Sequence, residues 1–466
     1  MNPVLEEFSQ LKGLTSSTVF NSFALKNTIQ KLSNLMQSSQ NRNAVEPHHW
    51  QDIVHVCSIG VQVINQKEFK ENDLEFLAII FRFLRNACGG SGRSHIYLLN
   101  SPECVEFIHL PLRILLHKKE PKEITVLKIC IQLFGNLLVL NERAKPLVWK
   151  YFFKESAFKS LLCSPDPTVQ EYTMMVLYNS MSDNHCNEIL TTNDGHDIVK
   201  AVTDSLLKNF VDWGMLFIEC LLKREEFQYC YTPMPLENRL LILDIITEHL
   251  KSIENEETLI IPFANIEYFK RSFITLVEKI AVLYSVNENM EPSEFVKILS
   301  LLCTASVCNA YILYMHSCKD LLEKCIETLK CVHLLGKDGS NVFSSISSSK
   351  ILSAQCDEQI ASHPLFGFKK DLVKLIGNLC YGCKENQDLV RKLDGIPLVL
   401  DCCKLDAKNP YIMQWCILAI RNIVHQNEEN QAILAGITTT GEIEDSSFLK
   451  EIGINVRYKD GKLSLS

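Results

Sequence analysis

Two cysteines, Cys380 and Cys383, stand in a Cys-x-x-Cys spacing within the segment IGNLCYGCKENQDLV, residues 376–390. This spacing is used by thioredoxin-like redox sites, in which a thiolate is the nucleophile, and by one half of many zinc sites. A zinc site also needs a second pair, and the neighbouring Cys402 and Cys403 lack the spacing for one. The role of the pair therefore depends on whether its thiols recur wherever the segment recurs.

Other segments with reactive residue types form no recognisable site. The glycine-rich segment CGGSGRS, residues 88–94, lacks the lysine of a phosphate-binding P-loop and follows a predicted helix, not a strand. His48, His49 and His55 share no metal-ligand spacing with a carboxylate or cysteine, and TNDGHD, residues 192–197, is typical of a turn. We therefore expect a non-enzymatic protein with no catalytic residue, no metal site and no cofactor.

Asn378 is the reference point of a repeat. In a near-copy around Asn422, Glu-Asn-Gln again follows at positions +7 to +9 and an aliphatic pair at +11 and +12, and the two asparagines are 44 residues apart. The same frame recurs upstream around Asn86, Asn136 and Asn179, at intervals of 50 and 43 residues. A period of about 40–47 residues is typical of helical solenoids of the HEAT and armadillo types.

The thiols do not recur with this repeat. The positions of Cys380 and Cys383 are occupied by Val424 and Asn427 in the next copy, whereas the asparagine, the polar turn and the aliphatic pair are kept. We therefore interpret both cysteines as packing residues, since a free cysteine behaves as a small hydrophobe.

Local signals place each reference asparagine near the end of a helix of about four turns. Asp73, Asp166 and Asn409 lie 13 residues earlier and are favoured N-cap types, and Pro167 and Pro410 suit the first helical position. The helix that ends near Asn136 has two apolar stripes, formed by Leu127, Ile131, Phe134 and Leu138 and by Cys130, Leu133 and Leu137. A helix that is apolar on two sides must lie between neighbours. The sequence therefore predicts an all-α, armadillo/HEAT-like right-handed α-solenoid.

Charge and composition exclude several classes of function. The 466 residues carry a net charge of −8, with a pI near 5.9, which has the wrong sign for coating nucleic acid. No segment reaches the ~18 uncharged apolar residues needed to cross a bilayer, and the N-terminal residues do not resemble a signal peptide. The 19 cysteines, spread through apolar segments, favour a reduced, cytosolic or nuclear compartment.

Residues 377–434, GNLCYGCKENQDLV through NEENQAIL, closely resemble the C-terminal domain of the ataxin-10 family, and the strong match extends over about a hundred residues from Pro364 onward. The resemblance implies an armadillo-like fold and a cytoplasmic, often perinuclear, adaptor without catalytic activity. It also implies roles in neuron survival, neurite outgrowth and cytokinesis, and a location at the centrosome, basal body or midbody. Implied partners are O-GlcNAc transferase, a heterotrimeric G-protein β subunit and a second copy of the chain.

In armadillo proteins the asparagine of the third helix of each unit can bind the backbone of an extended peptide. By resemblance, the candidate positions for peptide binding on the concave face are Asn86, Asn136, Asn179, Asn378 and Asn422. An amide suits this task because it both donates and accepts hydrogen bonds. The alternative is that each asparagine caps its local turn or bonds to the adjacent repeat.

Two readings of the function remain open. The first is a scaffold that binds partner proteins and associates with itself through exposed helical faces. The second is a karyopherin-like adaptor that carries cargo peptides. Nuclear-import adaptors of this fold place a tryptophan four residues before the asparagine, and none of the five copies has one there, while Trp415 lies seven residues before its asparagine.

The sequence predicts four regions. Residues 1–335 form a helical repeat region, irregular from about 205, and residues 336–363 form a Ser-rich flexible loop open to phosphorylation or glycosylation. Residues 364–437 form the C-terminal armadillo repeats, and residues 438–466 form a polar tail with short β-like fragments.

Overall fold

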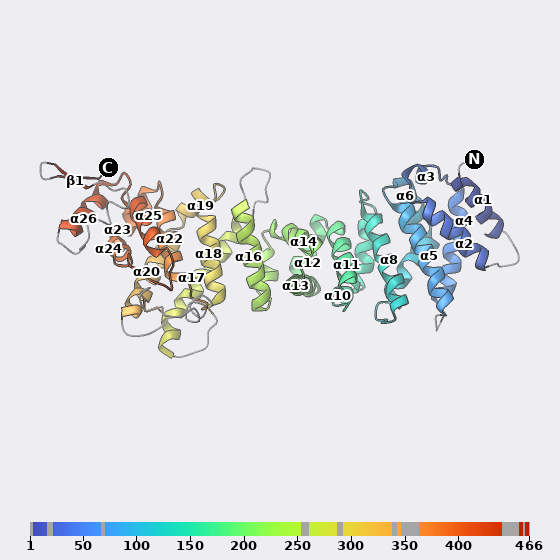
Figure 1. The fold of residues 1–466 in the computed structure, drawn as a ribbon, viewed down its shortest axis with the longest axis horizontal. Coiled ribbons are helices and arrows are strands. Elements are labelled where there is room, and N and C mark those ends of the chain that lie inside the picture. Colours follow the sequence, from blue (N-terminus) through green and yellow to red (C-terminus); the bar gives the residue numbers. More distant parts are fainter. Residues whose placement is uncertain are drawn as a thin grey trace. The chain divides into compact units, whose positions relative to one another are not determined.

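A computed structural model describes residues 3–15, 22–66, 70–252, 261–286, 292–337, 343–345, 363–439, 456–459 and 462–465. Nearly all of these residues are helical, and the chain divides into two compact units, Met1–Met234 and Pro235–Ser466 (Figure 1). The prediction of an all-α solenoid is confirmed, because both units are built from helices stacked in rows. No helix among the described residues is long and apolar enough to cross a membrane.

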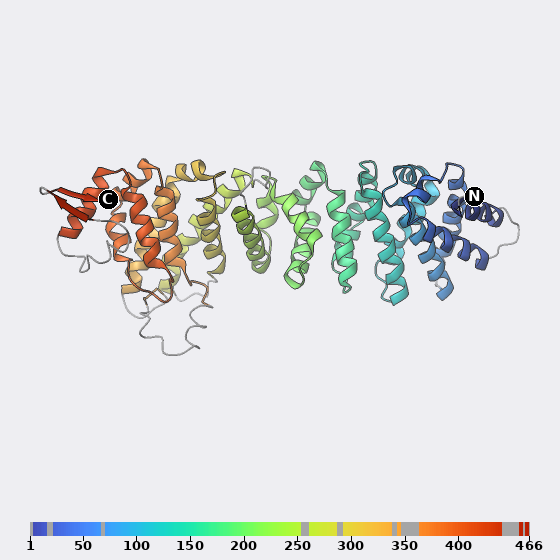
Figure 2. The ribbon, with the colours of Figure 1, turned by 45° about the horizontal axis from the view of Figure 1, so that its top comes forward.

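Unit 1 consists of successive helices, which from α6 onward are arranged in repeating sets of three, beginning with α6, α7 and α8. Its helices are α1 (Pro3–Thr15), α2 (Ser22–Leu35), α3 (Ser39–Asn43), α4 (His49–Ile64), α5 (Glu71–Cys88), α6 (Gly92–Asn100), α7 (Pro102–Ile114), α8 (Pro121–Leu138), α9 (Ala144–Trp149) continued by the π-helix η1 (Lys150–Lys154), α10 (Ala157–Leu162), α11 (Pro167–Ser180), α12 (Asp183–Thr191), α13 (Asn193–Lys208), α14 (Asp212–Leu222) and α15 (Phe227–Tyr231). The last helix of each set packs on the last helix of the next, so that α2, α5, α8, α11 and α14 form one row (Figure 2).

Unit 2 repeats this plan. Its elements are α16 (Leu236–Ser252), α17 (Phe263–Val286), α18 (Ser293–Ala305), α19 (Ile312–Ser317), α20 (Lys319–Lys337), α22 (Phe368–Cys380), α23 (Lys384–Lys392), α24 (Gly395–Asp401), α25 (Ile412–Val424), α26 (Glu428–Thr439), β1 (Val456–Lys459) and β2 (Lys462–Leu465). Helices α16, α18, α22 and α25 form the row, and β1 pairs antiparallel with β2, with Val456 opposite Leu465.

The row helices are buried on two sides, as the apolar stripes predict. All seven stripe residues of α8 are at most 4% exposed. Glycines stand where α22 packs on α25 and where α8 packs on α11. A Cβ on Gly377 of α22 would lie 2.8 Å from both Cα and Cβ of Ala419 on α25, and a Cβ on Gly135 of α8 would lie 2.3 Å from Cε of Met175 on α11. Close helix packing therefore selects glycine at position 377, where the neighbouring atoms are fixed, whereas at position 135 the flexible end of Met175 can move aside.

Four row helices end with the same backbone turn. The fourth residue after the reference asparagine of α5, α8, α22 and α25 has a positive φ, and these residues are Gly90 (67°), Leu140 (52°), Gly382 (63°) and Gln426 (52°). A left-handed residue at this place stops the helix and turns the chain towards the next one.

The predicted helix starts are confirmed for Asp166 and wrong for Asp73 and Asn409. Asp73 is the third residue of α5, and the N-cap is Lys70, whose N–H donates to Oδ2 of Asp73 at 2.9 Å. Asp166 caps α11 through its Oδ1, which accepts from the N–H groups of Thr168 (3.0 Å) and Val169 (3.3 Å), with Pro167 at the first helical position. The corresponding prediction for Asn409 and Pro410 is wrong, because α25 begins only at Ile412. Asn409 instead accepts a hydrogen bond from the N–H of Lys370 at 3.1 Å.

The four-region division stays a prediction. Most of the Ser-rich segment (338–342 and 346–362) and residues 440–455 of the tail lie outside the described residues.

Candidate peptide-binding groove

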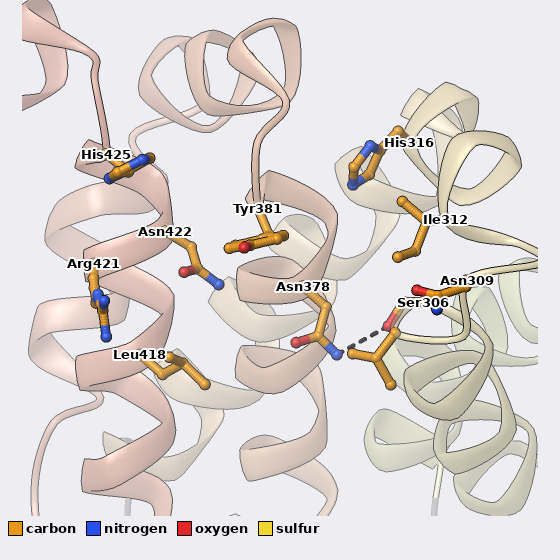
Figure 3. A pocket seen from close by; sticks show the side chains of 11 residues that line it. Ser306, Asn309, Ile312, His316, Asn378, Tyr381, Leu418, Arg421, Asn422 and His425 are labelled. Carbon is orange, nitrogen blue, oxygen red and sulfur yellow. Dashed lines mark hydrogen bonds between the residues drawn. The ribbon is translucent and has the colours of Figure 1, made fainter. Parts of the chain in front are cut away.

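A groove of about 610 Å³ lies along the ends of the row helices in unit 2 (Figure 3). Residues from the end of α18, from α19, from α22 and from α25 line it: Ser306, Val307, Asn309, Ile312, His316, Asn378, Tyr381, Leu418, Arg421, Asn422 and His425. Two of the five predicted asparagines, Asn378 and Asn422, therefore lie in one groove. The repeat brings them there because each stands in the last turn of its row helix.

Both asparagines use their Nδ2 to hold the preceding helix. Asn422 donates to the carbonyl of Gly377 at 3.0 Å, and Asn378 donates to Oγ of Ser306 at 2.9 Å and to the carbonyl of Cys303 at 3.4 Å. Neither Oδ1 makes a hydrogen bond to another described residue. Figure 3 shows the Asn378 oxygen directed away from Ser306. The groove therefore offers two amide oxygens as acceptors, and the hydrogen bonds from Nδ2 to the preceding helix fix their orientation.

Asn86 and Asn136 bond to the preceding row helix of unit 1 in the same way, although Oδ1 of Asn86 accepts from the guanidinium of Arg85 at 3.1 and 3.2 Å. Asn86 donates to the carbonyl of Ser33 at 2.9 Å, and Asn136 donates to the carbonyl of Arg85 at 2.9 Å. In each case the acceptor lies one helix back in the row, so these bonds support the alternative that the asparagines join adjacent repeats.

Asn179 does not occupy the equivalent position. The N–H that follows α11 belongs to Met181 and donates to the carbonyl of Tyr178 at 3.1 Å, whereas the matching bond after α22 runs from Tyr381 to Asn378 itself. Tyr178 is thus the structural equivalent, and Asn179 lies about 100° further around the helix. The Asn179 amide makes no hydrogen bond to another described residue.

The recurring Glu-Asn-Gln segment closes the row helices. Asn386 and Gln387 donate to the carbonyls of Leu379 (2.8 Å) and Cys380 (3.3 Å) at the end of α22. Asn430 and Gln431 do the same at the end of α25, with the carbonyls of Ile423 (2.8 Å) and Val424 (2.9 Å) as acceptors. These side chains satisfy carbonyl groups that a helix end leaves without a partner.

The groove is positively charged. None of its lining residues is acidic, and the exposed Arg421 forms no ion pair with a described residue. Burial lowers the pKa of His316, although the Asn378 carbonyl opposes this shift, so the imidazole is neutral at pH 7. Tyr381, 64% exposed, Val307, 56% exposed, and Leu418 add apolar surface to the same walls.

The two cysteines of the Cys-x-x-Cys segment have the environments expected of packing residues. Cys380 is fully buried, and burial raises the pKa of its thiol far above the usual range, whereas Cys383 is half-buried. The described residues contain no group of three or more His, Cys, Asp or Glu side chains that could hold a metal ion.

One reactive-looking cluster was not predicted. His333 of α20 lies between Asp401 (Nε2 to Oδ2, 2.8 Å) and Cys402 (Nδ1 to Sγ, 3.6 Å), which is the order of a Cys-His-Asp triad. However, Cys402 is only 3% exposed, burial raises its pKa to about 11, and Lys369 Nζ lies 3.0 Å from the same Nδ1. The thiol is therefore protonated and its base is already engaged, so this cluster lacks an activated nucleophile.

Comparisons of the sequence with known families and proteins point to the ataxin-10 family. Residues 368–466 match the model of the spinocerebellar ataxia type 10 protein domain. Human ataxin-10 is 28% identical over 456 residues, which cover 94% of this chain and 93% of the human protein. The ataxin-10 homolog of Dictyostelium discoideum is 40% identical over 90 residues, covering 19% of this chain and 15% of the homolog. A crystal structure of SYS-1 aligns with 91% of this chain and 66% of that one, at 13% identity and a TM-score of 0.38.

Proposed function

Because the chain belongs to the ataxin-10 family, we propose that it is a protein-binding scaffold whose unit 2 groove holds an extended, acidic segment of a partner protein. The observation that carries this proposal is the pair of asparagines in the groove. Their Nδ2 atoms are held by the preceding helix, and their Oδ1 atoms are left to accept.

The paired acceptors suit a peptide backbone. An extended peptide presents N–H groups that no internal bond satisfies, and an amide oxygen accepts from them whatever the side chain. Asn378 and Asn422 occupy equivalent positions on the neighbouring helices α22 and α25, so they can bind two points along one strand. Because each oxygen is pre-oriented, little side-chain entropy is lost on binding.

The charge of the groove selects the partner. Arg421 is exposed and without an ion pair among the described residues, and a guanidinium binds a carboxylate with two parallel hydrogen bonds. With no acidic residue on the walls, an Asp or Glu side chain meets no charge of its own sign there. Tyr381 and Leu418 give apolar side chains of the same peptide a surface to cover.

The cargo-adaptor alternative has less support. Such an adaptor holds cargo lysines against open tryptophan faces, but the Lys374 ammonium already lies 4.7 Å from the centroid of the Trp415 ring. Arg421 would repel a basic cargo.

The family supports the finer parts of the proposal. These are roles in neuron survival, neurite outgrowth and cytokinesis in a cytoplasmic, perinuclear, centrosomal, basal-body or midbody setting. O-GlcNAc transferase, a G-protein β subunit and a second copy of the chain are the proposed partners, and the chain acts on them by binding alone.

Selection of a displayed random-peptide library on the full-length chain tests the groove. We expect enrichment of peptides with Asp or Glu, and at least tenfold weaker binding of these peptides to Arg421→Glu in fluorescence polarisation. Arg93→Glu, which reverses an exposed arginine on α6 of unit 1, is the matched control and should bind like the wild type. N-methylation of the peptide backbone should also abolish binding.

Equal binding to Arg421→Glu and to the wild type, or tolerance of N-methylation at every position, would refute the groove as the peptide site.

A further inference from the structure

Two cysteine thiols of unit 1 lie within reach of each other. Cys186 is on α12 and Cys220 on α14, the first and third helices of one set, and their Sγ atoms are 3.8 Å apart. Both are free thiols, and the two helices are in contact. A disulfide needs an S–S distance of about 2.05 Å, so the two sulfurs must approach by roughly 2 Å, which side-chain rotation and a small helix shift can supply.

The surroundings of the two thiols give them different exposure to solvent and different pKa values. Cys186 is 1% exposed, whereas Cys220 is half-buried and open to small molecules. The hydrogen bond from Cys186, together with the charges of Lys223 and Arg224, lowers the pKa of Cys220 to about 7 against the opposing effect of burial. Asp183 on α12 acts in the opposite direction but is paired with Arg224.

The same hydrogen bond and burial raise the pKa of Cys186 far above the usual range. At pH 7 about half of the Cys220 side chains are therefore thiolates, on the accessible sulfur, while Cys186 behind it stays a thiol. A low-pKa, accessible cysteine beside a second thiol is the arrangement found at redox-sensing sites.

We propose that Cys220 and Cys186 form a redox-sensitive modification site, in which a hydroperoxide converts the two thiols into a disulfide between α12 and α14. The Cys220 thiolate attacks the peroxide oxygen, the O–O bond breaks, and the sulfenic acid Cys220–SOH forms as hydroxide or an alkoxide leaves and takes a proton from water. Cys186 then gives up its proton, its sulfur attacks the sulfenic sulfur, and water leaves. The thiols lose two electrons, the peroxide gains them, and a dithiol reductant reverses the reaction.

Other thiol pairs differ from this one. A hydrogen bond with the buried Cys416 lowers the pKa of the half-buried Cys403, but no cationic side chain of a described residue lowers that pKa as Lys223 and Arg224 do at Cys220. Cys57 and Cys104 also share a hydrogen bond, but both are completely buried, so no peroxide reaches them. Cys163 is exposed but forms no hydrogen bond with another cysteine among the described residues. The new bond would close a loop of 34 residues and fix the first helix of the set against the third.

Peptide mass spectrometry of the full chain after treatment with hydrogen peroxide tests the site. We expect a Cys186–Cys220 linked peptide that dithiothreitol removes, and a midpoint near pH 7 for iodoacetamide alkylation of Cys220. Cys186→Ser should abolish the link and let dimedone trap the sulfenic acid on Cys220. Cys186→Ala, which also removes the hydrogen-bond donor, should move the alkylation midpoint up by about 1.5 pH units, towards an ordinary thiol.

Cys163→Ser is the control and should leave the link unchanged, and circular dichroism confirms that each variant is folded. Oxidation of Cys220 to sulfinic acid in the wild type without a linked peptide, or no faster oxidation of Cys220 than of Cys163, would overturn the proposal. An alkylation midpoint unchanged in Cys186→Ala would overturn the role of the hydrogen bond.

Discussion

Gln387 joins two row helices of unit 2, and its removal should be among the most damaging single changes there. Its Nε2 donates to the carbonyls of Asn422 (2.9 Å), His425 (3.2 Å) and Cys380 (3.3 Å), and its Oε1 accepts from Asn427 at 3.2 Å. The side chain is 2% exposed.

If Gln387 is replaced with alanine, buried carbonyl groups at the ends of α22 and α25 lose their hydrogen-bond donor. An amide nitrogen has two hydrogens, so two of the three acceptors lose a full partner, and each such loss costs about 1–3 kcal/mol. The freed rotamer entropy of glutamine returns up to about 2 kcal/mol. We therefore expect Gln387→Ala to destabilise this region by about 2–4 kcal/mol.

Gln431, one repeat later, is the matched comparison. It is half-buried and makes one recorded hydrogen bond, from Nε2 to the carbonyl of Val424 at 2.9 Å, so Gln431→Ala should cost only about 1 kcal/mol. Hydrogen exchange of the full chain, followed by mass spectrometry of peptides from α22 and α25, measures both. A loss of 2–4 kcal/mol corresponds to roughly 30- to 1,000-fold faster exchange, against about fivefold for Gln431→Ala.

Equal exchange in the two variants would refute the reasoning, because it would mean that the bonds between helices contribute no more than a local helix cap. Less than fivefold acceleration in Gln387→Ala would refute it as well.

Three further changes follow from the packing and the turns. Gly377→Ala should cost about 1–3 kcal/mol in thermal unfolding, since its Cβ would overlap Ala419, and Ala419→Gly in the same chain should recover part of the loss. Asp166→Ala should remove about 1 kcal/mol of N-cap stability at pH 7. Burial alone would raise the pKa of Asp166, but Lys128 and two backbone N–H groups together lower it, so its contribution is present above about pH 4 and is lost as pH falls further. Denaturant unfolding at pH 7 and pH 3 should therefore show the variant and the wild type converging in acid. Leu140→Gly should stabilise unit 1 by about 0.5–1 kcal/mol in the same assay, because Leu140 is fully exposed at a φ of 52°.

The row of stacked helices was predictable because its cause is local and repeated. Two-sided apolar helices ending in the same polar turn recur along the chain, and this pattern identified α5, α8, α11, α22 and α25. The repeat period varies by several residues, however, so it cannot show which of two neighbouring residues is the structural equivalent. An asparagine stands next to the frame position at Tyr178, and only the backbone bond that closes α11 shows which of the two is equivalent.

The hydrogen-bond partners of the recurring polar residues were not predictable, because these partners lie far away in the sequence. Glu-Asn-Gln was recognised as recurrent, but Gln387 bonds to Asn422, 35 residues on, through a contact that only packing creates. Asn409 has a cap-like sequence, yet it bonds to Lys370 across the stack. For the groove, the asparagines were predicted, while Tyr381 and His425 were missed although both stand three residues after one.

Gly382 and Gln426 end α22 and α25 with the same left-handed step, 44 residues apart. If residues 382–425 were deleted, so that Tyr381 were followed directly by Gln426, the backbone would still turn in the same direction after α22. One repeat could therefore be removed or added while the helix-ending turns of the repeats on either side stay the same.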